Sequence, residues 1–228
     1  MSKMFSRISD RYDLLNGVMS FGRHHSWRKK AVQLAINGQD GVALDVATGT
    51  ADMALDLLAT PSIKEVVGLD FTSDMLRRGL AKANDRGVYY GFHPMVGDAH
   101  QVPIRNDSFV CATVGFGIRN FIDVPSALSE ILRVLKPAGK VVILEIVKPE
   151  GTIMSRLFPF YFRNITPLFG SILAGESEAY TYLPESVQEF MKPSELAVLM
   201  KEAHLSEVTV TTMALGSVAI LSLSLIHI

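Results

Sequence analysis

The sequence predicts a doubly wound α/β fold, in which a mostly parallel sheet is covered by helices on both faces. From about residue 43, short apolar runs alternate with amphipathic segments. The apolar runs are continuous, as in parallel strands that are buried on both faces. Two more strand-like runs follow the last amphipathic segment, so seven strands are expected. The 228 residues suffice for one domain with a substantial core.

Each apolar run is expected to form one strand, and each amphipathic segment one helix. The parallel strands are expected at residues 42–47, 65–69, 88–96, 109–116 and 140–147. Helices are expected at residues 51–60, 73–86, 123–135 and 193–204, and the closing strands at 207–213 and 217–223. In an open sheet of this kind, ligands bind outside the carboxyl ends of the strands, where the strand order reverses.

Composition excludes some classes of function. The 22 basic residues nearly balance the 23 acidic ones, which argues against a dedicated nucleic-acid binder. A single cysteine and the absence of HxH or HExxH patterns predict no metal site. Neither a signal peptide nor a run of about 18 apolar residues is visible, so a cytoplasmic protein is expected. The mean hydropathy of +0.25 adds an apolar substrate or a peripheral contact with the inner face of the membrane as candidates.

A turn of small residues follows the first expected strand. Asp45 stands near the strand end, and Thr48, Gly49, Thr50 and Ala51 form the turn before a helix. Small residues let a ligand approach the backbone N–H groups. The Asp45 carboxylate is expected to hold a cationic ligand amine, directly or through water. On its own, this turn also fits a dehydrogenase that binds a dinucleotide.

The ends of the next strands favour one cofactor. Asp70 ends the second strand, where a carboxylate reaches the two ribose hydroxyls. Asp98, followed by Ala99, ends the third strand, where a carboxylate can accept from the adenine amino group. Gly115 ends the fourth strand and lets the ligand lie against the sheet. Acidic strand ends fit a neutral nucleoside with a positive sulfonium, and they fit a pyrophosphate badly. The sequence therefore predicts S-adenosylmethionine and the Rossmann-like fold of class I S-adenosylmethionine-dependent methyltransferases, for which the closing strand pair is typical.

One domain is expected over residues 1–228, with two segments covering the substrate end of the sheet. Residues 1–37 are predicted to form a helical cap, and residues 150–185 an insertion rich in aromatic side chains. Residues 38–149 form the expected cofactor-binding core, and residues 186–228 the C-terminal helix and strand pair.

Three blocks of sequence resemble those of the UbiE/MenG-type C-methyltransferases of quinone biosynthesis. They are YDLLN at residues 12–16, continuing through Ser20, His24 and Trp27; FGIRN at 116–120; and RVLKPAG at 133–139, continuing to Glu145. The resemblance covers nearly the whole chain, although Leu15, Ala138 and Val147 replace a usual methionine, glycine and serine. It implies methylation of a ring carbon on a prenylated hydroquinone, giving a menaquinol or a ubiquinol precursor. It also places Thr50, Asp70, Asp98, Ala99 and Gly115 at cofactor contacts, with Gly115 where serine is frequent.

Arg119, Asn120 and Tyr12 are the expected catalytic residues. A guanidinium stays protonated, so Arg119 is expected to stabilise a phenolate or to assist a water molecule, unless it is a surface or salt-bridge residue. Asn120 is expected to orient the hydroquinone oxygen or that water, and Tyr12 to face the substrate. His24 and His25 could act as an acid/base pair, but packing of His24 beside Trp27 is the favoured interpretation.

Several alternatives remain open at this level. The aromatic segment at residues 158–169, flanked by Arg156 and Arg163, fits a channel for the prenyl tail, a contact with lipid, or core and homodimer packing. The activity could belong to a methyltransferase of another small molecule. A non-catalytic nucleotide-binding module is disfavoured by the retained acidic residues and Arg119. The apolar ending at residues 221–228 differs from the usual polar one, and it suggests no function.

Overall fold

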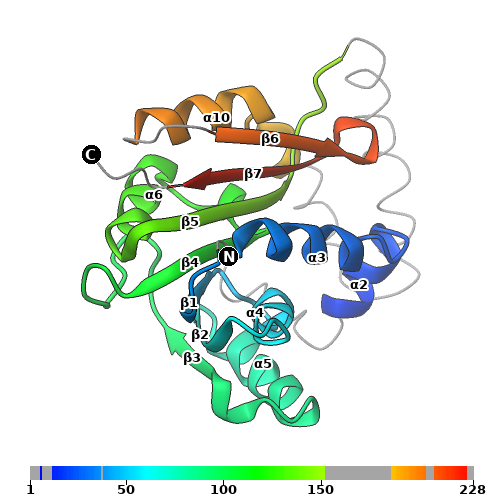
Figure 1. Cartoon of the computed structure of the whole chain (residues 1–228). Coiled ribbons are helices and arrows are strands. Elements are labelled where there is room, and N and C mark those ends of the chain that lie inside the picture. Colours follow the sequence, from blue (N-terminus) through cyan, green and yellow to red (C-terminus); the bar gives the residue numbers. More distant parts are fainter. Residues whose placement is uncertain (1–5, 7–11, 37, 152–185, 204–207, 225–228) are drawn as a thin grey trace.

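The computed structural model describes residues 6, 12–36, 38–151, 186–203 and 208–224. Its centre is a seven-stranded sheet with the order β3-β2-β1-β4-β5-β7-β6 (Figure 1). The strands are β1 (Gly41–Val46), β2 (Ile63–Asp70), β3 (Phe92–Val96), β4 (Phe109–Gly115), β5 (Leu135–Ile146), β6 (Val208–Met213) and β7 (Val218–Ser224). Strands β1 to β5 are parallel, and β7 is antiparallel to both β5 and β6. The predicted seven-stranded, mostly parallel sheet is confirmed.

Helices cover both faces of this sheet, and a separate apolar core fills each side (Figure 1). The helices are α2 (Tyr12–Met19), α3 (His24–Ala35), α4 (Asp52–Leu58), α5 (Ser73–Asp85), α6 (Val124–Arg133) and α10 (Pro193–Glu202). One core packs α3 and α4 on the central strands, and the other packs α6 and α10 on the opposite face. Burial on both faces explains why these strands read as continuous apolar runs.

Two strands differ in length from the expectation. The third strand begins at Phe92 and not at residue 88, because Tyr89–Gly91 forms a short 3₁₀ turn, η1. The fifth strand begins earlier than expected, at Leu135, which pairs with Phe109. A shift of register follows between Phe109 and Cys111, so residues 135–139 of the RVLKPAG block form a bulged start of β5, and its first two residues are the last residue and the C-cap of α6. Pairing between strands, which local composition does not encode, sets both limits.

The N-terminal cap packs on the sheet through α3. His24, Arg28 and Ala31 belong to its buried face. The Nδ1 atom of His24 lies 2.6 Å from the Ser20 hydroxyl. Burial, together with the nearby Arg28 charge, lowers the pKa of His24 to about 4. The imidazole is therefore neutral at physiological pH. Its burial fits the packing interpretation of His24, although the ring that lies 4.0 Å from it, between centroids, is that of His25.

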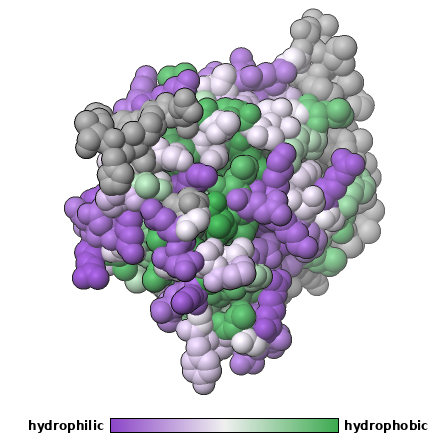
Figure 2. Space-filling view, in the orientation of Figure 1, coloured by the Kyte–Doolittle hydropathy of each residue, from purple (hydrophilic) through white to green (hydrophobic). Residues whose placement is uncertain are grey.

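The C-terminal strands close the sheet. Residues 221–224, which begin the unusual apolar ending, belong to β7, and Leu221 and Leu223 are buried between β5 and β6. The aromatic segment at 158–169 lies outside the described residues. On the face in Figure 2, hydrophilic side chains occupy both flanks, and a narrower hydrophobic band lies between them. Within the described parts of the chain, no helix is long and apolar enough to span a membrane.

Four alanines stand in the left-handed region of backbone conformation. The φ angles are 53° at Ala47, 66° at Ala51, 60° at Ala138 and 48° at Ala214. Glycine adopts this region without penalty, whereas a Cβ atom makes it unfavourable by roughly 1–2 kcal/mol. Ala138 is the position where alanine replaces a glycine that is usual in the resembled family, and the backbone keeps a glycine-like conformation there.

Replacing the exposed Ala138 by glycine is expected to stabilise the protein by up to about 1 kcal/mol, because relief of strain exceeds the entropy lost on folding. Denaturant unfolding measures the change. Ala59 is a matched control, since it is also exposed but has a φ of −75°. Ala59→Gly should give no gain, and an equal gain at both positions would contradict the strain at Ala138.

Candidate functional site

A cleft opens at the carboxyl ends of β1 and β4, where the strand order reverses. Five residues proposed from the sequence line it: Tyr12, Gly49, Asp70, Gly115 and Asn120. The other lining residues are Ala47, Phe71, Thr72, Met75, Phe116, Gly117 and Phe121. The cleft therefore brings together the turn after β1, the ends of β2 and β4, and the cap helix α2.

The turn after β1 approaches its neighbours too closely for larger side chains. A Cβ atom built on Gly117 would lie 2.5 Å from the Cβ of Ala47. A Cβ atom built on Gly79 would lie 2.8 Å from the Cβ of Ala51. At Gly115 the nearest atoms belong to the flexible Met53 side chain, 3.2 Å away. The floor of the cleft is thus largely backbone and small side chains, as a flat ligand requires.

Asp70 is fixed at the rim of the cleft by two backbone donors. Its Oδ2 atom accepts from the Gly49 N–H group at 2.9 Å, and its Oδ1 atom from the Thr72 N–H group at 2.8 Å. Burial raises the pKa of the carboxyl, although these hydrogen bonds act in the opposite direction. The residue is only 7% exposed, so it presents a preoriented acceptor to the cleft.

Asp45 lies beneath the turn, not in the lining of the cleft. It is 1% exposed, and its two oxygens accept from the hydroxyls of Thr48 and Thr113, each at 2.6 Å. Burial raises the pKa of Asp45 to about 6. Each oxygen accepts one hydroxyl group and keeps a further lone pair, so the expected contact with a ligand amine, directly or through water, stays a prediction. In this structure Asp45 holds the turn.

Thr50 belongs to the turn, and its buried side chain anchors the cap helix α2. Its hydroxyl donates to Asp13 Oδ1 at 2.7 Å and accepts from Lys82 Nζ at 2.8 Å. The same ammonium pairs with Asp13 at 2.5 Å and with Asp52 at 2.9 Å. One lysine on α5 therefore ties α2, α4 and the turn together, and it holds the neighbouring Tyr12 over the cleft.

Asp98 and Ala99 lie beside the cleft but do not line it. The Asp98 side chain is 69% exposed. Its Oδ1 atom accepts from the His100 N–H group at 2.9 Å, and the Nδ1 atom of His100 lies 2.6 Å away. Ala99 is buried in the core on the α6 face. The Gly97 N–H group donates to the Asp70 carbonyl at 3.1 Å, so this turn adjoins the rim that Asp70 forms.

Arg119 is held behind the lining of the cleft in a buried ion pair. Its Nη1 atom donates to Glu145 Oε1 and to the Phe116 carbonyl, both at 2.6 Å. The Arg119 side chain is 7% exposed and that of Glu145 is fully buried. Glu145 also accepts from the Ile146 N–H group at 2.8 Å. Arg119 therefore forms a salt bridge in this structure, and its catalytic role stays a prediction.

Tyr12 shares this electrostatic environment. Burial raises the pKa of its hydroxyl, while the Arg119 charge lowers it and the Asp70 and Glu145 carboxylates raise it. The hydroxyl is thus neutral at physiological pH and can donate a hydrogen bond. Asn120, next to Arg119 in a 3₁₀ turn, lines the same cleft. The three expected catalytic residues lie together.

Several supporting residues were not among the expected site residues. Glu145 had a signal in the sequence, because a charged residue inside a buried apolar strand requires a partner. Asp13 belongs to the YDLLN block, but its link to Lys82 and Thr50 depends on how α2 packs. His100 gives no sequence signal beyond its position after Asp98.

Comparison with known proteins gives matches over most of the chain. The demethylmenaquinone methyltransferase of Roseiflexus sp. (strain RS-1) is 39% identical over 96% of this chain and 91% of its own length. That of Thermus thermophilus is 41% identical over 89% of this chain and 91% of its own. The ubiquinone/menaquinone biosynthesis C-methyltransferase UbiE of Geotalea daltonii is 40% identical over 88% of this chain and 85% of its own length.

Solved structures show the same fold at low identity. A SAM-dependent methyltransferase from Aquifex aeolicus aligns with a TM-score of 0.63 and 16% identity, covering 87% of this chain and 89% of its own. A putative S-adenosyl-L-methionine-dependent methyltransferase from Methanococcus maripaludis aligns with a TM-score of 0.67 and 16% identity. The alignment covers 100% of this chain and 94% of that protein's chain. The predicted class I methyltransferase fold is confirmed. The model of the ubiE/COQ5 methyltransferase family matches residues 1–223, and the chain belongs to this family.

Proposed function

We propose that this chain transfers a methyl group from S-adenosylmethionine to a ring carbon of a prenylated hydroquinone, either demethylmenaquinol or the equivalent ubiquinol precursor. The observation that carries the proposal is the position of Tyr12, Asn120 and the Arg119–Glu145 ion pair beside a cleft whose rim holds Asp70. The relatives named as demethylmenaquinone methyltransferases support the substrate class.

The cleft fits the cofactor by the chemistry of its rim. Asp70 is the acidic group that lines the cleft, and a carboxylate offers about four lone-pair sites, so it can accept from ribose hydroxyls while the Gly49 and Thr72 N–H groups hold it. Gly49 and Gly115 leave room for a flat group against the ends of β1 and β4. Asp98 carries an exposed carboxylate next to this rim for the adenine amino group. When bound, S-adenosylmethionine supplies a methyl group that is activated by a sulfonium charge.

The protein's role toward the acceptor is to stabilise the ionised hydroquinone. Loss of a hydroxyl proton places electron density on the neighbouring ring carbon, and a fixed positive charge favours that ionised form. Arg119 supplies this charge at any working pH. Glu145 fixes its orientation through the 2.6 Å ion pair. Tyr12, as a neutral donor, and Asn120 are placed to orient the hydroquinone oxygens or a water molecule.

A substrate with a prenyl tail requires an apolar approach to the cleft. Leu14, Phe71 and Ile122 are 54%, 46% and 95% exposed. Phe71 itself lines the cleft, and the other two stand within two residues of lining residues. Exposed apolar side chains at such a mouth fit a peripheral contact with the membrane that carries the substrate. This contact is part of the proposal.

The direct test uses purified protein, S-adenosylmethionine with a labelled methyl group, and reduced demethylmenaquinol. We expect calorimetric binding of the cofactor and transfer of the label to a ring carbon. Oxidised demethylmenaquinone is the matched control, because it has no hydroxyl to ionise and should not accept label. Cofactor binding without transfer to menaquinone or ubiquinone precursors would contradict the proposed substrate.

Removing the Arg119 charge should lower kcat about 100-fold or more, as loss of one fixed transition-state interaction typically does. Arg119→Met alone would leave Glu145 buried and unpaired, which destabilises a fold by about 3–5 kcal/mol. The informative variant therefore combines Arg119→Met with Glu145→Gln, and Glu145→Gln alone is its control. The cofactor Kd should change less than about threefold. Wild-type kcat in the double variant would remove Arg119 from the mechanism.

If the mouth of the cleft contacts the membrane, a charge placed there should slow methylation of a membrane-bound quinol but not of a water-soluble one. Ile122→Glu should lower the rate severalfold with a long-tailed quinol in anionic vesicles, because the charge opposes apolar insertion. The rate with a short-tailed, water-soluble quinol should stay unchanged. Tyr90→Glu is the control, since Tyr90 is 91% exposed in η1, before β3. Equal vesicle rates for the wild type and both variants would rule out contact at Ile122.

A further inference from the structure

His100 bridges two loops at the edge of the cleft. Its Nδ1 atom lies 2.6 Å from Asp98 Oδ1, and its Nε2 atom accepts from the Asp123 N–H group at 3.2 Å. Since Nε2 accepts, the ring proton is on Nδ1, and Nδ1 donates to Asp98. Both nitrogens of one imidazole are therefore used, one on each loop.

The bridge determines how Asp98 meets a ligand. Its Oδ1 atom receives two hydrogen bonds from His100, one from the backbone and one from the ring, and together they restrict rotation of the carboxylate. These bonds also lower the pKa of Asp98 and keep it ionised. The carboxylate side chain is mostly exposed, so without the ring only the His100 backbone N–H group would restrain its orientation. Oδ2 remains as the acceptor that a nucleobase amino group can use.

The second loop belongs to the other side of the cleft. Asp123 is the N-cap of α6, where its side chain accepts from the Ser126 N–H group at 3.1 Å. The imidazole also meets the ring of Phe121 edge-on, with 5.9 Å between centroids, and Phe121 lines the cleft. One side chain thus connects the turn after β3 with the loop that follows Arg119 and Asn120.

We propose that His100 is a positioning residue that orients Asp98 for the adenine amino group and ties this turn to residues 121–123 of the cleft wall. The inference rests on the proposed function for the place of the cofactor. It assigns a role to a residue that touches neither the reacting methyl group nor the quinol.

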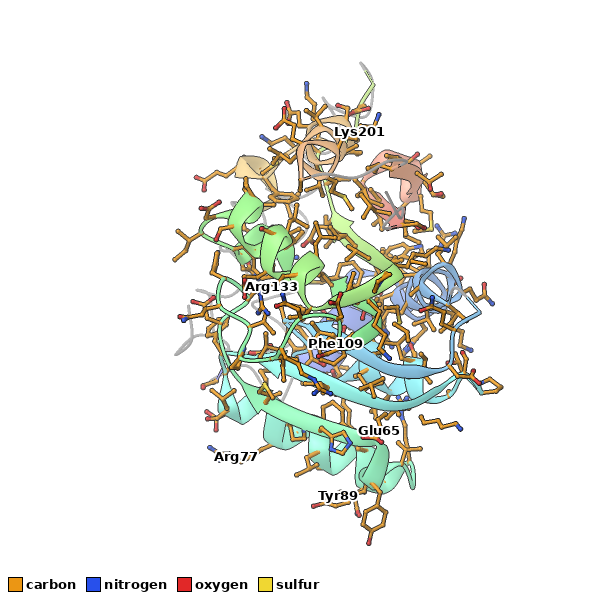
Figure 3. The ribbon with its side chains drawn as sticks, turned by 60° about the vertical axis from the view of Figure 1, so that its left-hand side comes forward. Glu65, Arg77, Tyr89, Phe109, Arg133 and Lys201 are labelled. Atoms are coloured by element: carbon orange, nitrogen blue, oxygen red, sulfur yellow. The ribbon has the colours of Figure 1, made fainter. Side chains whose placement is uncertain are left out.

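The rest of this loop is anchored independently of His100. Arg133, at the other end of α6, donates to the carbonyls of Val102 and Ile104, each at 2.9 Å (Figure 3). Glu130 accepts from the Val102 N–H group at 3.0 Å. Loss of the imidazole therefore frees only the end of the loop that carries Asp98, and the fold should persist.

Two substitutions separate the two arms of the bridge. Asparagine places an amide nitrogen where His100 has Nδ1, so His100→Asn retains the contact with Asp98. Glutamine places its amide where His100 has Nε2, so His100→Gln loses that contact and retains the one with Asp123. His93→Asn is the matched control, because it breaks a second exposed histidine–carboxylate pair, with Glu65 at 2.9 Å. Glu65 lies toward the end of the sheet that carries Tyr89 (Figure 3).

The measurements are the Kd of S-adenosylmethionine by calorimetry, and KM and kcat with saturating demethylmenaquinol. We expect His100→Gln to raise the cofactor Kd and KM about fivefold to tenfold, with kcat at saturating cofactor within about twofold. His100→Asn should restore the cofactor Kd to within about twofold, and His93→Asn should match the wild type. All variants should unfold at similar temperatures.

Two results would overturn the role of His100. One is a cofactor Kd for His100→Gln within twofold of the wild type, and the other is an equal loss in His100→Gln and His100→Asn. Wild-type protein that binds the cofactor but methylates no quinol would contradict the proposed function alone. The Kd comparison among the variants would still test His100.

Discussion

The turn after β1 is the constraint on which the rest of the site depends. In residues 47–51, Ala47, Gly49 and Ala51 have positive φ angles. Strain of this kind at the two alanines persists only where the surroundings fix it. Asp70 supplies one such restraint by accepting from the Gly49 N–H group. Asp45 supplies another through the Thr48 hydroxyl. Two carboxylates thus hold the backbone in the shape that leaves the floor of the cleft open.

Buried charge is the second organising element. Arg119 and Glu145 have hardly any exposed surface, and such a pair gains little net stability because both charges lose their hydration. Its value is geometric, since Glu145 is fixed on β5 by the Ile146 N–H group and leaves the guanidinium few orientations. A charge that is already desolvated and oriented needs little reorganisation when a phenolate forms.

The sequence predicts the sheet well because each strand is buried on both faces, so its apolar run is visible locally. It also predicts Asp70, Gly49 and Gly115 as neighbours, because strand ends converge where the order of a parallel sheet reverses. It could not predict that Asp45 accepts hydrogen bonds from two threonine hydroxyls beneath the turn. That outcome depends on the Thr113 hydroxyl, which stands 68 residues away and becomes a neighbour only when β4 pairs with β1.

The same limit applies to the partners of Arg119 and to the start of β3. Glu145 is 26 residues from Arg119 in the chain, and only the pairing of β4 with β5 brings their segments together. β3 begins where η1 ends, and η1 depends on the close approach of Gly91 to Leu58 and to the Lys64 carbonyl. A Cβ atom built on Gly91 would lie 3.0 Å from each of them. Tertiary contact decides such details.

The ammonium of Lys82 joins the cofactor turn to the cap helix, and this link has a thermodynamic consequence. A ligand that orders Thr50 also orders Asp13, and with it the helix that carries Tyr12. Coupling between two sites is reciprocal. Any free energy by which a ligand at the turn stabilised α2 would therefore reappear as tighter binding of a second ligand that contacts α2. Lys82 would couple the two binding events through its contacts with Thr50 and Asp13.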